Sequence, residues 1–239
     1  MDIFTKLRYF LKHPVRVVVQ KYYKTLLSNT FNQPEKYLDL KFKILKNTES
    51  DIYEHLDTLS EYASTVESVF ETGVRGGVSS WSLMHGLKNN NKINKCLFLN
   101  DINECDISEI LKIAEKLKID LEYKWINNLD LNLTRNFDLL FIDTWHIYGQ
   151  LKRELVKFSP FINKFILIHD TTTFGELGES LLLGQNIKEQ SIQSGYQVKE
   201  IKYGLNLAIE EFLSKNLDWT LEKHFKNCNG LTILKKIGN

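Results

Sequence analysis

Cysteine and proline are scarce in this chain, which contains three residues of each type among 239. The cysteines, Cys96, Cys105 and Cys228, share no CxxC motif or other metal-type spacing. We therefore expect neither a thiolate zinc site nor a disulfide framework, and the low cysteine content suits a reducing compartment. Since no Pro-, Gly- or Ser-rich tract separates two folding units, the main part of the chain is predicted to be one domain.

An excess of charge of either sign is also absent, because 31 basic and 30 acidic side chains leave a net charge of +1. Enzymes that act on nucleic acids usually carry a basic footprint, so we expect a small-molecule acceptor and no nucleic acid. No apolar run approaches the roughly 18 residues of a transmembrane helix. The N-terminus lacks the small-residue cleavage site of a secretory signal, and residence in the cytoplasm is therefore expected.

Residues 1–47 differ in texture from the rest of the chain. Apolar side chains recur at helical spacing over residues 4–11 and again over 17–27, with Pro14 between the two stripes. The first 24 residues carry six basic side chains, namely Lys6, Arg8, Lys12, Arg16, Lys21 and Lys24. We predict a helical extension over 1–47 that packs on the main domain, 48–239, or on a second subunit of a homodimer. A helix that lies on a membrane surface or binds an acidic partner is the alternative.

The main domain alternates between strand and helix patterns. Seven apolar segments are predicted strands: 66–71, 96–99, 121–125, 137–142, 165–168, 219–225 and 231–234. Helices are predicted from a cap at Ser50 and Asp51 to about residue 62, from Ser79 onward, and over 106–117, 148–158 and 205–213. A polar loop over 171–194 is long enough to form a substrate lid.

This order of elements indicates the fold class. The near-continuous apolarity of 137–142 is what a parallel strand covered on both faces requires. Five strand–helix units are followed by two strands joined at Asn229-Gly230, a strong hairpin signal. We therefore predict an α/β, Rossmann-like, doubly wound seven-stranded sheet with an antiparallel C-terminal hairpin.

Acidic residues terminate four of the predicted strands: Glu71, Asp101, Asp143 and Asp170. In a doubly wound sheet, ligands bind at the carboxyl ends of the strands. Turn chemistry explains one or two such acids, since Asp often begins a turn. Four acids in register are harder to explain in that way, and we expect them to surround a ligand.

A glycine turn follows the first strand, at Gly73, Gly76 and Gly77. Glycines let the backbone approach a ligand closely, and the next helix offers free N–H groups to a carboxylate or phosphate. Asp101 is placed to accept hydrogen bonds from the two hydroxyls of a ribose. The spacing is Gly-x-x-Gly-Gly rather than GxGxxG, so the pattern implies an adenosine-type cofactor without choosing between NAD and S-adenosylmethionine. A tight strand–helix connection without a ligand is the alternative.

Three segments resemble class I S-adenosylmethionine-dependent methyltransferases. They are 69–80, Val-Phe-Glu-Thr-Gly-Val-Arg-Gly-Gly-Val-Ser-Ser; 137–148, Phe-Asp-Leu-Leu-Phe-Ile-Asp-Thr-Trp-His-Ile-Tyr; and 165–171, Phe-Ile-Leu-Ile-His-Asp-Thr. The resemblance covers about residues 50–239 and is strongest to small-molecule and sugar O-methyltransferases and to the related cephalosporin hydroxylase-like family. It implies that Glu71, Gly73 and Gly77 contact the methionine end of the cofactor, with Asp101 at the ribose. Residues Arg75, Ser79 and Asp143 are implied as further cofactor contacts, and the adenine is expected near 125–127.

The resemblance also implies a reaction centre. Asp143, His146, His169 and Asp170 stand at the ends of the fourth and fifth strands. Metal-dependent relatives bind a divalent cation with acids at these ends, which makes Asp143 and Asp170 candidate ligands of Mg²⁺ or another divalent metal. His169 stands where many relatives have a further acid, and an imidazole favours a softer transition metal. His146 is the candidate general base, with a loop-ordering role as its alternative.

The leading functional prediction is O-methylation of a sugar, as in glycan modification, or of another small hydroxylated metabolite. A hydroxylase-like metal enzyme remains as an alternative at the same site. An NAD-linked oxidoreductase is disfavoured by the glycine spacing and the terminal hairpin. A catalytically silent interaction module, which recruits a partner through residues 1–47, is the non-enzymatic alternative.

Overall fold

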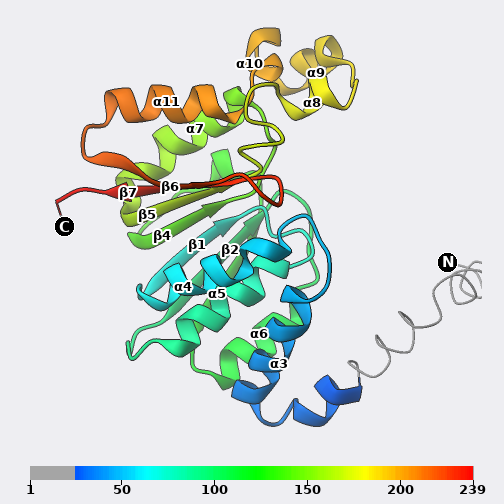
Figure 1. The fold of residues 1–239 in the computed structure, drawn as a ribbon, viewed down its shortest axis with the longest axis vertical. Helices are drawn as coiled ribbons and strands as arrows, with labels where there is room; N and C mark the ends of the chain where they lie inside the picture. Colours follow the sequence, from blue (N-terminus) through cyan, green and yellow to red (C-terminus); the bar gives the residue numbers. More distant parts are fainter. Residues whose placement is uncertain (1–24, 239) are drawn as a thin grey trace, which may run out of the picture.

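The computed structural model describes residues 25–238, and in it one mixed sheet is covered by helices on both faces (Figure 1). The predicted arm over residues 1–24 lies outside the described residues. The strands are β1 Ser68–Thr72, β2 Cys96–Asp101, β3 Asp120–Trp125, β4 Phe137–Ile142, β5 Ile162–His169, β6 Trp219–Phe225 and β7 Leu231–Lys236. Among the described residues, no helix is long and apolar enough to cross a membrane.

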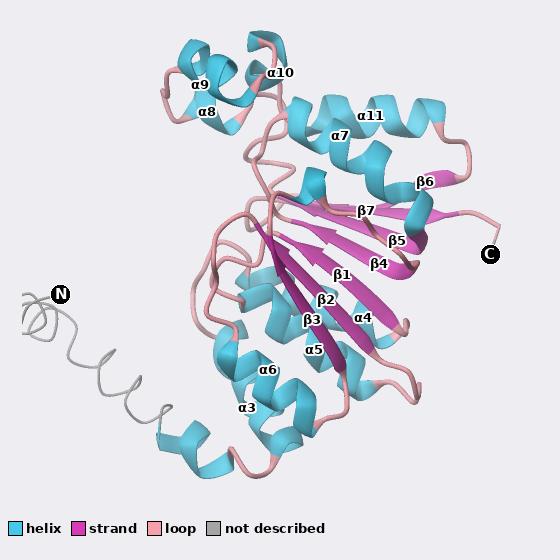
Figure 2. Ribbon diagram, turned by 180° about the vertical axis from the view of Figure 1, so that it is seen from behind, coloured by secondary structure: helices cyan, strands magenta, loops and turns pink. Residues whose placement is uncertain are grey.

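The strand order is β3-β2-β1-β4-β5-β7-β6 (Figure 2). Strands β1 to β5 pair in parallel, whereas β7 runs antiparallel to both β5 and β6. The connection between β6 and β7 places Asn229 and Gly230 at positive φ, as its Asn-Gly sequence predicts. The predicted fold, a doubly wound seven-stranded sheet with an antiparallel C-terminal hairpin, is confirmed.

Alternation along the strands divides the core into two layers. Val69 faces the layer that holds α4 Leu56–Ser64, α5 Val78–Asn89 and α6 Ser108–Lys116, while its neighbour Phe70 faces the opposite layer. That opposite layer holds α7 Tyr148–Phe158 and α11 Leu205–Lys215. Because β4 is central, all six of its residues are buried, which explains why its sequence is apolar except for Asp138.

The helix before the sheet, α3 Pro34–Lys46, belongs to the first of these layers. Its side chains Tyr37, Leu38 and Phe42 are buried in the same cluster as Trp81 of α5. The described end of the N-terminal extension therefore packs on the main domain. The boundary between residues 47 and 48 stays a prediction.

Several predicted helix starts are wrong by a few residues. The segment after Ser50 and Asp51 begins with a 3₁₀ turn, Tyr53–His55, and no side chain caps α4. Helix α5 begins at Val78, because Gly77 adopts the left-handed conformation immediately before it. Helix α6 begins at Ser108, whose N–H donates to the carboxylate of Asp106 at 3.1 Å.

The predicted polar loop over 171–194 is wrong in part, because much of it is helical. Leu177 and Tyr203 form an isolated antiparallel bridge that closes the base of an excursion from the sheet. Residues 177–203, called the cap below, contain α8 Glu179–Leu182, α9 Ile187–Ser194 and α10 Val198–Lys202. The remaining short helices are the 3₁₀ turns Asn128–Asp130 and Ser159–Phe161.

Candidate functional site

The four predicted acids lie at one edge of the sheet, because β1, β2, β4 and β5 are parallel and end there. A cavity of about 970 Å³ opens at this edge. The predicted residues that line it are Gly73, Arg75, Asp101, Asp143 and His146. Glu71, Gly77, Ser79, His169 and Asp170 lie around it but do not form its wall. The size of the cavity is at the upper end of the range found for small-molecule and cofactor sites.

The turn between β1 and α5 requires glycine at its first position. Gly73 has φ +94°, and a Cβ there would lie 1.8 Å from the carbonyl oxygen of Asp143. This close approach brings the end of β4 against the end of β1. Gly76, in contrast, faces open space. The turn therefore keeps a free surface beside the cavity.

Asp101 ties the end of β2 to this turn. Its Oδ2 accepts a hydrogen bond from the backbone N–H of Arg75 at 2.9 Å, and its Oδ1 accepts one from Asn103 at 2.8 Å. Each carboxylate oxygen can accept a second hydrogen bond. Asp101 thus fixes the turn and keeps acceptor capacity toward the cavity, which suits the predicted contact with vicinal hydroxyls.

Glu71 lies behind the turn and is completely buried. Ser79 donates a hydrogen bond to its Oε1, while Oε2 has no partner within the described chain. Burial raises the pKa of Glu71 to about 8, against the opposing effect of the hydroxyls of Ser79 and Ser80. An acid with an unpaired buried oxygen beside a cavity is suited to receive a cationic group.

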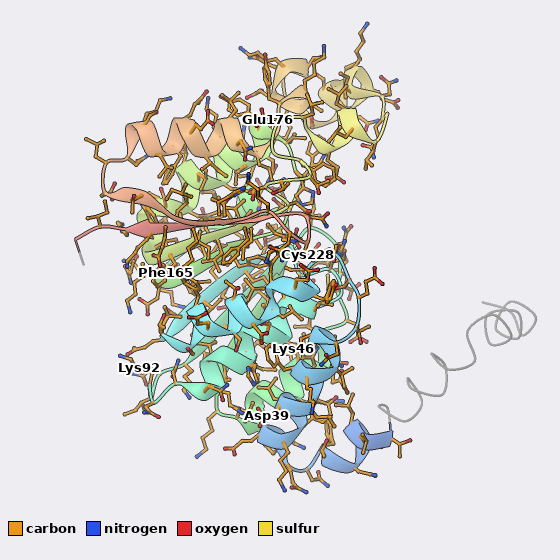
Figure 3. The ribbon with its side chains drawn as sticks, in the orientation of Figure 1. Asp39, Lys46, Lys92, Phe165, Glu176 and Cys228 are labelled. Atoms are coloured by element: carbon orange, nitrogen blue, oxygen red, sulfur yellow. The ribbon has the colours of Figure 1, made fainter. Side chains whose placement is uncertain are left out.

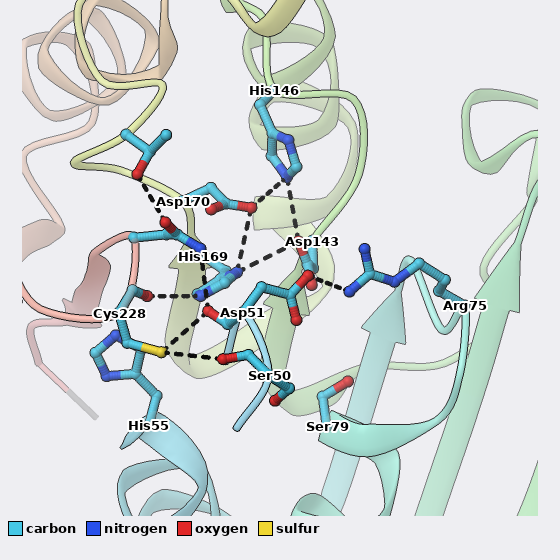
Figure 4. Close-up of polar contacts among 12 residues, drawn as sticks. Ser50, Asp51, His55, Arg75, Ser79, Asp143, His146, His169, Asp170 and Cys228 are labelled. Atoms are coloured by element: carbon cyan, nitrogen blue, oxygen red, sulfur yellow. Dashed lines mark hydrogen bonds and ion pairs between the residues drawn. The ribbon is translucent and has the colours of Figure 1, made fainter. Parts of the chain in front are cut away.

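The candidate reaction centre contains two acids and two histidines that face one another (Figure 4). His146 Nε2 lies 3.1 Å from Asp143 Oδ1 and 2.9 Å from Asp170 Oδ2. His169 Nδ1 lies 3.5 Å and 3.3 Å from the same two oxygens, and its Nε2 is 3.2 Å from the carbonyl oxygen of Cys228. Asp170 has φ +62°, a strained backbone conformation of the kind that concentrates at functional sites.

Electrostatic coupling shifts all four groups. Burial alone would lower the pKa of His146, but hydrogen bonds to Asp143, Asp170 and Glu179 outweigh it and raise the pKa to about 11. The same competition raises the pKa of His169 to about 10. Burial opposes ionisation of Asp143 and Asp170, yet their bonds to the histidines hold both carboxyl pKa values below the usual range. In this arrangement both histidines are positively charged at neutral pH.

One set of side chains in this centre has the geometry of a cation site. Ligand atoms of Asp143, His169 and Asp170 all lie within 4.8 Å of one another. Nδ1 of His169 is buried and has no hydrogen bond of good geometry in the described structure. Two carboxylates and one imidazole fit a divalent cation, and the nitrogen favours a transition metal over Mg²⁺.

The cap closes one side of the cavity through contacts with α7 and the end of β4. Glu179 Oε2 lies 3.0 Å from His146 Nδ1, and Ser180 accepts a hydrogen bond from the indole of Trp145 at 3.1 Å. The cavity is also lined by Gln193 and Ser194 at the end of α9, and by Gly195 and Tyr196 after it. The expected lid is therefore a helical cap that contacts the candidate reaction centre directly.

Sequence reasoning missed a polar network in the cavity wall, in which Thr72, Asn128, Gln150 and Tyr196 line the cavity and Glu154 lies behind them. Tyr196 donates to Gln150 at 2.5 Å, and Gln150 donates to Glu154 at 2.8 Å. Asn128 also donates to Glu154, at 2.5 Å, and to Thr72 at the end of β1, at 2.9 Å. Glu154 is completely buried, which raises its pKa. The sequence shows most of these polar residues within a predicted helix or next to a predicted strand. It does not show which of them pair, because the partners lie far apart in the sequence.

The region expected to hold the adenine, residues 125–127, lines the cavity only in part. Asn127 lines the cavity, whereas Trp125 is exposed and donates its indole N–H to the carbonyl of Ile102 at 2.9 Å. The wall near the end of β2 is formed by Asn100, Ile102, Asn103, Glu104 and Cys105. The loop after β2 therefore contributes more to this end of the cavity than the end of β3.

Comparison with known proteins shows similarity in fold and no match in sequence to a family model or a curated protein. A Corynebacterium glutamicum protein superposes with a TM-score of 0.52 at 13% identity, covering 78% of this chain and 82% of that one. A putative O-methyltransferase from Klebsiella pneumoniae gives 0.50 at 11% identity, over 85% and 89% of the two chains. An O-methyltransferase family protein from Burkholderia thailandensis gives 0.50 at 8% identity, over 87% and 62%. The chain thus has the α/β fold that these solved structures share.

Proposed function

We propose that the protein is an S-adenosylmethionine-dependent methyltransferase that methylates a hydroxyl group of a sugar or another small molecule. The observation that carries this proposal is that Gly73, Asp101 and Asp143, from three different strand ends, line one cavity. The shared fold with a putative O-methyltransferase supports it. Residence in the cytoplasm stays part of the proposal.

The cofactor has a natural orientation in this cavity. Asp101 accepts hydrogen bonds from the ribose hydroxyls, and the turn Gly73–Gly77 lies beside the methionine end, where the N-terminus of α5 attracts the carboxylate. Glu71 lies behind the turn, and its unpaired buried oxygen is our candidate partner for the amino group. The sulfonium then faces Asp143 and His146, which line the same cavity.

Methyl transfer needs the acceptor oxygen in line with the sulfonium, and it releases one proton from the acceptor. His146 is our candidate base, but a base must be neutral, and its three carboxylate partners keep it protonated to about pH 11. His146 therefore accepts a proton only after its contacts with Asp143 and Asp170 loosen. Until then it holds the two acids in place.

Asp143, His169 and Asp170 are the residues that would hold a divalent cation. Such a cation would lower the pKa of an acceptor hydroxyl bound beside it. His169 donates from Nε2 to the carbonyl of Cys228, which leaves Nδ1 directed at the two acids. The peptide carbonyl thus selects the tautomer that a ligand imidazole needs.

Calorimetry with S-adenosylhomocysteine tests the cofactor assignment. We expect the unmodified protein to bind it and Asp101→Ala to bind at least roughly tenfold more weakly, since two charge-assisted hydrogen bonds are lost. Asp120→Ala is the matched control, because Asp120 lies at the end of β3 that is remote from the cavity and, among residues 25–238, forms an ion pair with Arg135 alone. Absence of binding by the unmodified protein would refute the proposal.

A second candidate, a hydroxylase-like metal enzyme, is favoured by the imidazole in the cation site. Fe(II)-dependent oxygen uptake that His169→Gln abolishes, in a protein that transfers no methyl group, would select it over the methyltransferase.

A further inference from the structure

The cap carries several exposed aliphatic side chains. Leu181, Leu182 and Leu183 are exposed in succession at the end of α8, and Ile192 of α9 is 84% exposed. Helix α9 buries none of its eight residues. The inner face of α9 is only half-buried, with Ile187 packed against the cluster of Ile147, Tyr196 and Ile201. Exposed aliphatic patches mark interaction sites.

Exposed lysines belong to the same cap, and Lys188 lies one helical turn before Ile192 on the same side of α9. Lys188, Lys199 and Lys202 are exposed, and none of them makes an ion pair within the described part of the chain. Two of the three acids of the cap are paired, Glu179 with His146 and Glu200 with Arg153. Glu189 is exposed and pairs with no basic side chain of the described residues, so three unpaired lysines face one unpaired acid. The unpaired charge on the cap surface is therefore positive. We define the cap surface as Leu181, Leu182, Leu183, Ile192, Lys188, Lys199 and Lys202.

The cap surface adjoins the cavity mouth. Gln193, Ser194 and Gly195, which follow Ile192 directly, are exposed and also line the cavity. In Figures 1 and 2 the three cap helices project beyond the sheet at the edge where the cavity opens. Whatever covers the cap surface therefore lies beside the entrance to the site.

We propose that the cap surface docks the protein on an anionic lipid bilayer, with the leucines and Ile192 in the headgroup region and the lysines against lipid phosphates. A second copy of the chain is a poorer occupant, because a two-fold interface would place like-charged lysines against each other. An anionic bilayer complements both the apolar and the basic side chains. The six basic residues among residues 1–24 add to the same attraction.

Docking of the cap surface on a bilayer would also indicate the class of methyl acceptor. This inference rests on the proposed function. An entrance held against a bilayer favours a hydroxylated group carried at the lipid surface, such as a lipid-linked head group, over a freely diffusing metabolite. Docking itself does not require that the protein transfers methyl groups.

The test is sedimentation of the full chain with vesicles of phosphatidylcholine alone and of phosphatidylcholine mixed with phosphatidylglycerol. We expect binding to the mixed vesicles that weakens at high salt. The triple variant Leu182→Gln, Leu183→Gln, Ile192→Gln should bind the mixed vesicles at least roughly tenfold more weakly than the unmodified protein, because three aliphatic side chains no longer enter the headgroup region. The variant Lys188→Gln, Lys202→Gln should lose part of the salt-sensitive binding.

Ile93→Gln is the matched control. Ile93 is 91% exposed and lies next to Lys92, which Figure 3 shows at the far edge of the molecule from the cap. Its substitution should leave vesicle binding unchanged. All variants should keep their affinity for S-adenosylhomocysteine, so a failure of docking is distinguishable from a failure of the proposed function.

Three results would overturn the proposal. The first is equal vesicle binding by the cap variant and the unmodified protein. The second is loss of binding only in the arm variant Lys6→Gln, Arg8→Gln, Lys12→Gln. The third is a dimer that ignores vesicles and that the leucine and isoleucine substitutions dissociate.

Discussion

Two glycines of the same turn, Gly73 and Gly76, have different surroundings. Gly73 is confined by the carbonyl of Asp143 and has positive φ, whereas Gly76 faces open space at an ordinary φ. A methyl group at residue 73 must push β1 and β4 apart at their ends. At residue 76 it meets nothing in the protein.

We therefore expect Gly73→Ala to lower the free energy of unfolding by roughly 3 kcal/mol or more, from overlap and strain together. Gly76→Ala, the matched control, should unfold like the unmodified protein. Urea unfolding followed by circular dichroism measures both. Equal stabilities of the two variants would show that Asp143 does not press against residue 73.

Glu71 gives a prediction about pH. Burial raises its pKa from 4.5 to about 8 in the folded chain. Below pH 4.5 the carboxyl is protonated in both the folded and the unfolded state, so it does not lower the free energy of unfolding. As pH rises from 4.5 to 8, the unfolded state releases the proton first, so the folded protein loses stability at up to about 1.4 kcal/mol per pH unit.

Glu71→Gln should remove this loss. Relative to the unmodified protein, the variant should become more stable between pH 5 and 8, with the difference growing as pH rises. Chemical unfolding at several pH values measures the difference. Glu115→Gln, at an exposed position of α6, is the control and should show no such growth. A constant difference for Glu71→Gln would mean that the carboxyl is ionised in the folded protein.

At this scale, the sequence allowed part of the site to be predicted. Gly73, Asp101 and Asp143 were placed by local pattern, because each stands within three residues of the end of an apolar run. Glu154, Gln150 and Tyr196 were not, because Tyr196 lies 46 residues from Gln150, its hydrogen-bond partner. No local pattern joins residues so far apart.

Among the elements, the cap shows where periodicity fails. The central strands were predicted nearly in full, since burial on both faces produces unbroken apolar runs. Helix α9 buries nothing, so its sequence carries no apolar stripe and reads as a loop. A small apolar cluster, in which Ile201 and Tyr196 of the cap pack on Ile147, holds the cap together with polar contacts. The polar contacts of Glu179, Ser180 and Tyr196 reach His146, Trp145 and Gln150.

The bond from Tyr196 to Gln150 therefore controls how tightly the cap closes. Tyr196→Phe removes only the hydroxyl, and one hydrogen bond contributes about 1 kcal/mol. We expect amide hydrogens of α9 and α10 to exchange roughly fivefold faster in the variant, with α7 unchanged. Hydrogen exchange read by mass spectrometry measures this. The control is Tyr203→Phe, since Tyr203 is half exposed at the base of the cap, and equal exchange in both variants would contradict the role of Tyr196.

For the whole molecule, the chain order of strands and helices was enough to predict the sheet, because alternating units and one Asn-Gly turn admit few topologies. The gathering of His146 and His169 with Asp143 and Asp170 was expected, but the pairing of both rings with the same two carboxylate oxygens was not. This pairing depends on the register of β4 against β5 and on the carbonyl of Cys228, which the β6–β7 hairpin brings behind His169. These contacts exist only once the sheet is complete.

Thermal stability of the whole molecule reports on that centre. A ligand that binds only the folded state stabilises it by about 2.7 kcal/mol at a free concentration one hundred times its dissociation constant. We expect Mn²⁺, added to chelator-treated protein, to raise Tm by roughly 5–10 °C at such a concentration. Asp143→Asn should abolish the rise, because one of the three ligand side chains is lost. Asp130→Asn, at an exposed position, should retain it.

Measuring Tm of the unmodified protein with Mn²⁺ at several pH values shows whether the centre binds a cation. A cation must displace the charged ring of His146 from between Asp143 and Asp170, so binding should weaken steeply as pH falls and both histidines hold their protons. If Mn²⁺ leaves Tm unchanged at every pH, His146 alone holds the two acids, and the metal leaves the mechanism. Binding of S-adenosylhomocysteine through Asp101 would be unaffected by that result, because Asp101 is not among the three ligand side chains.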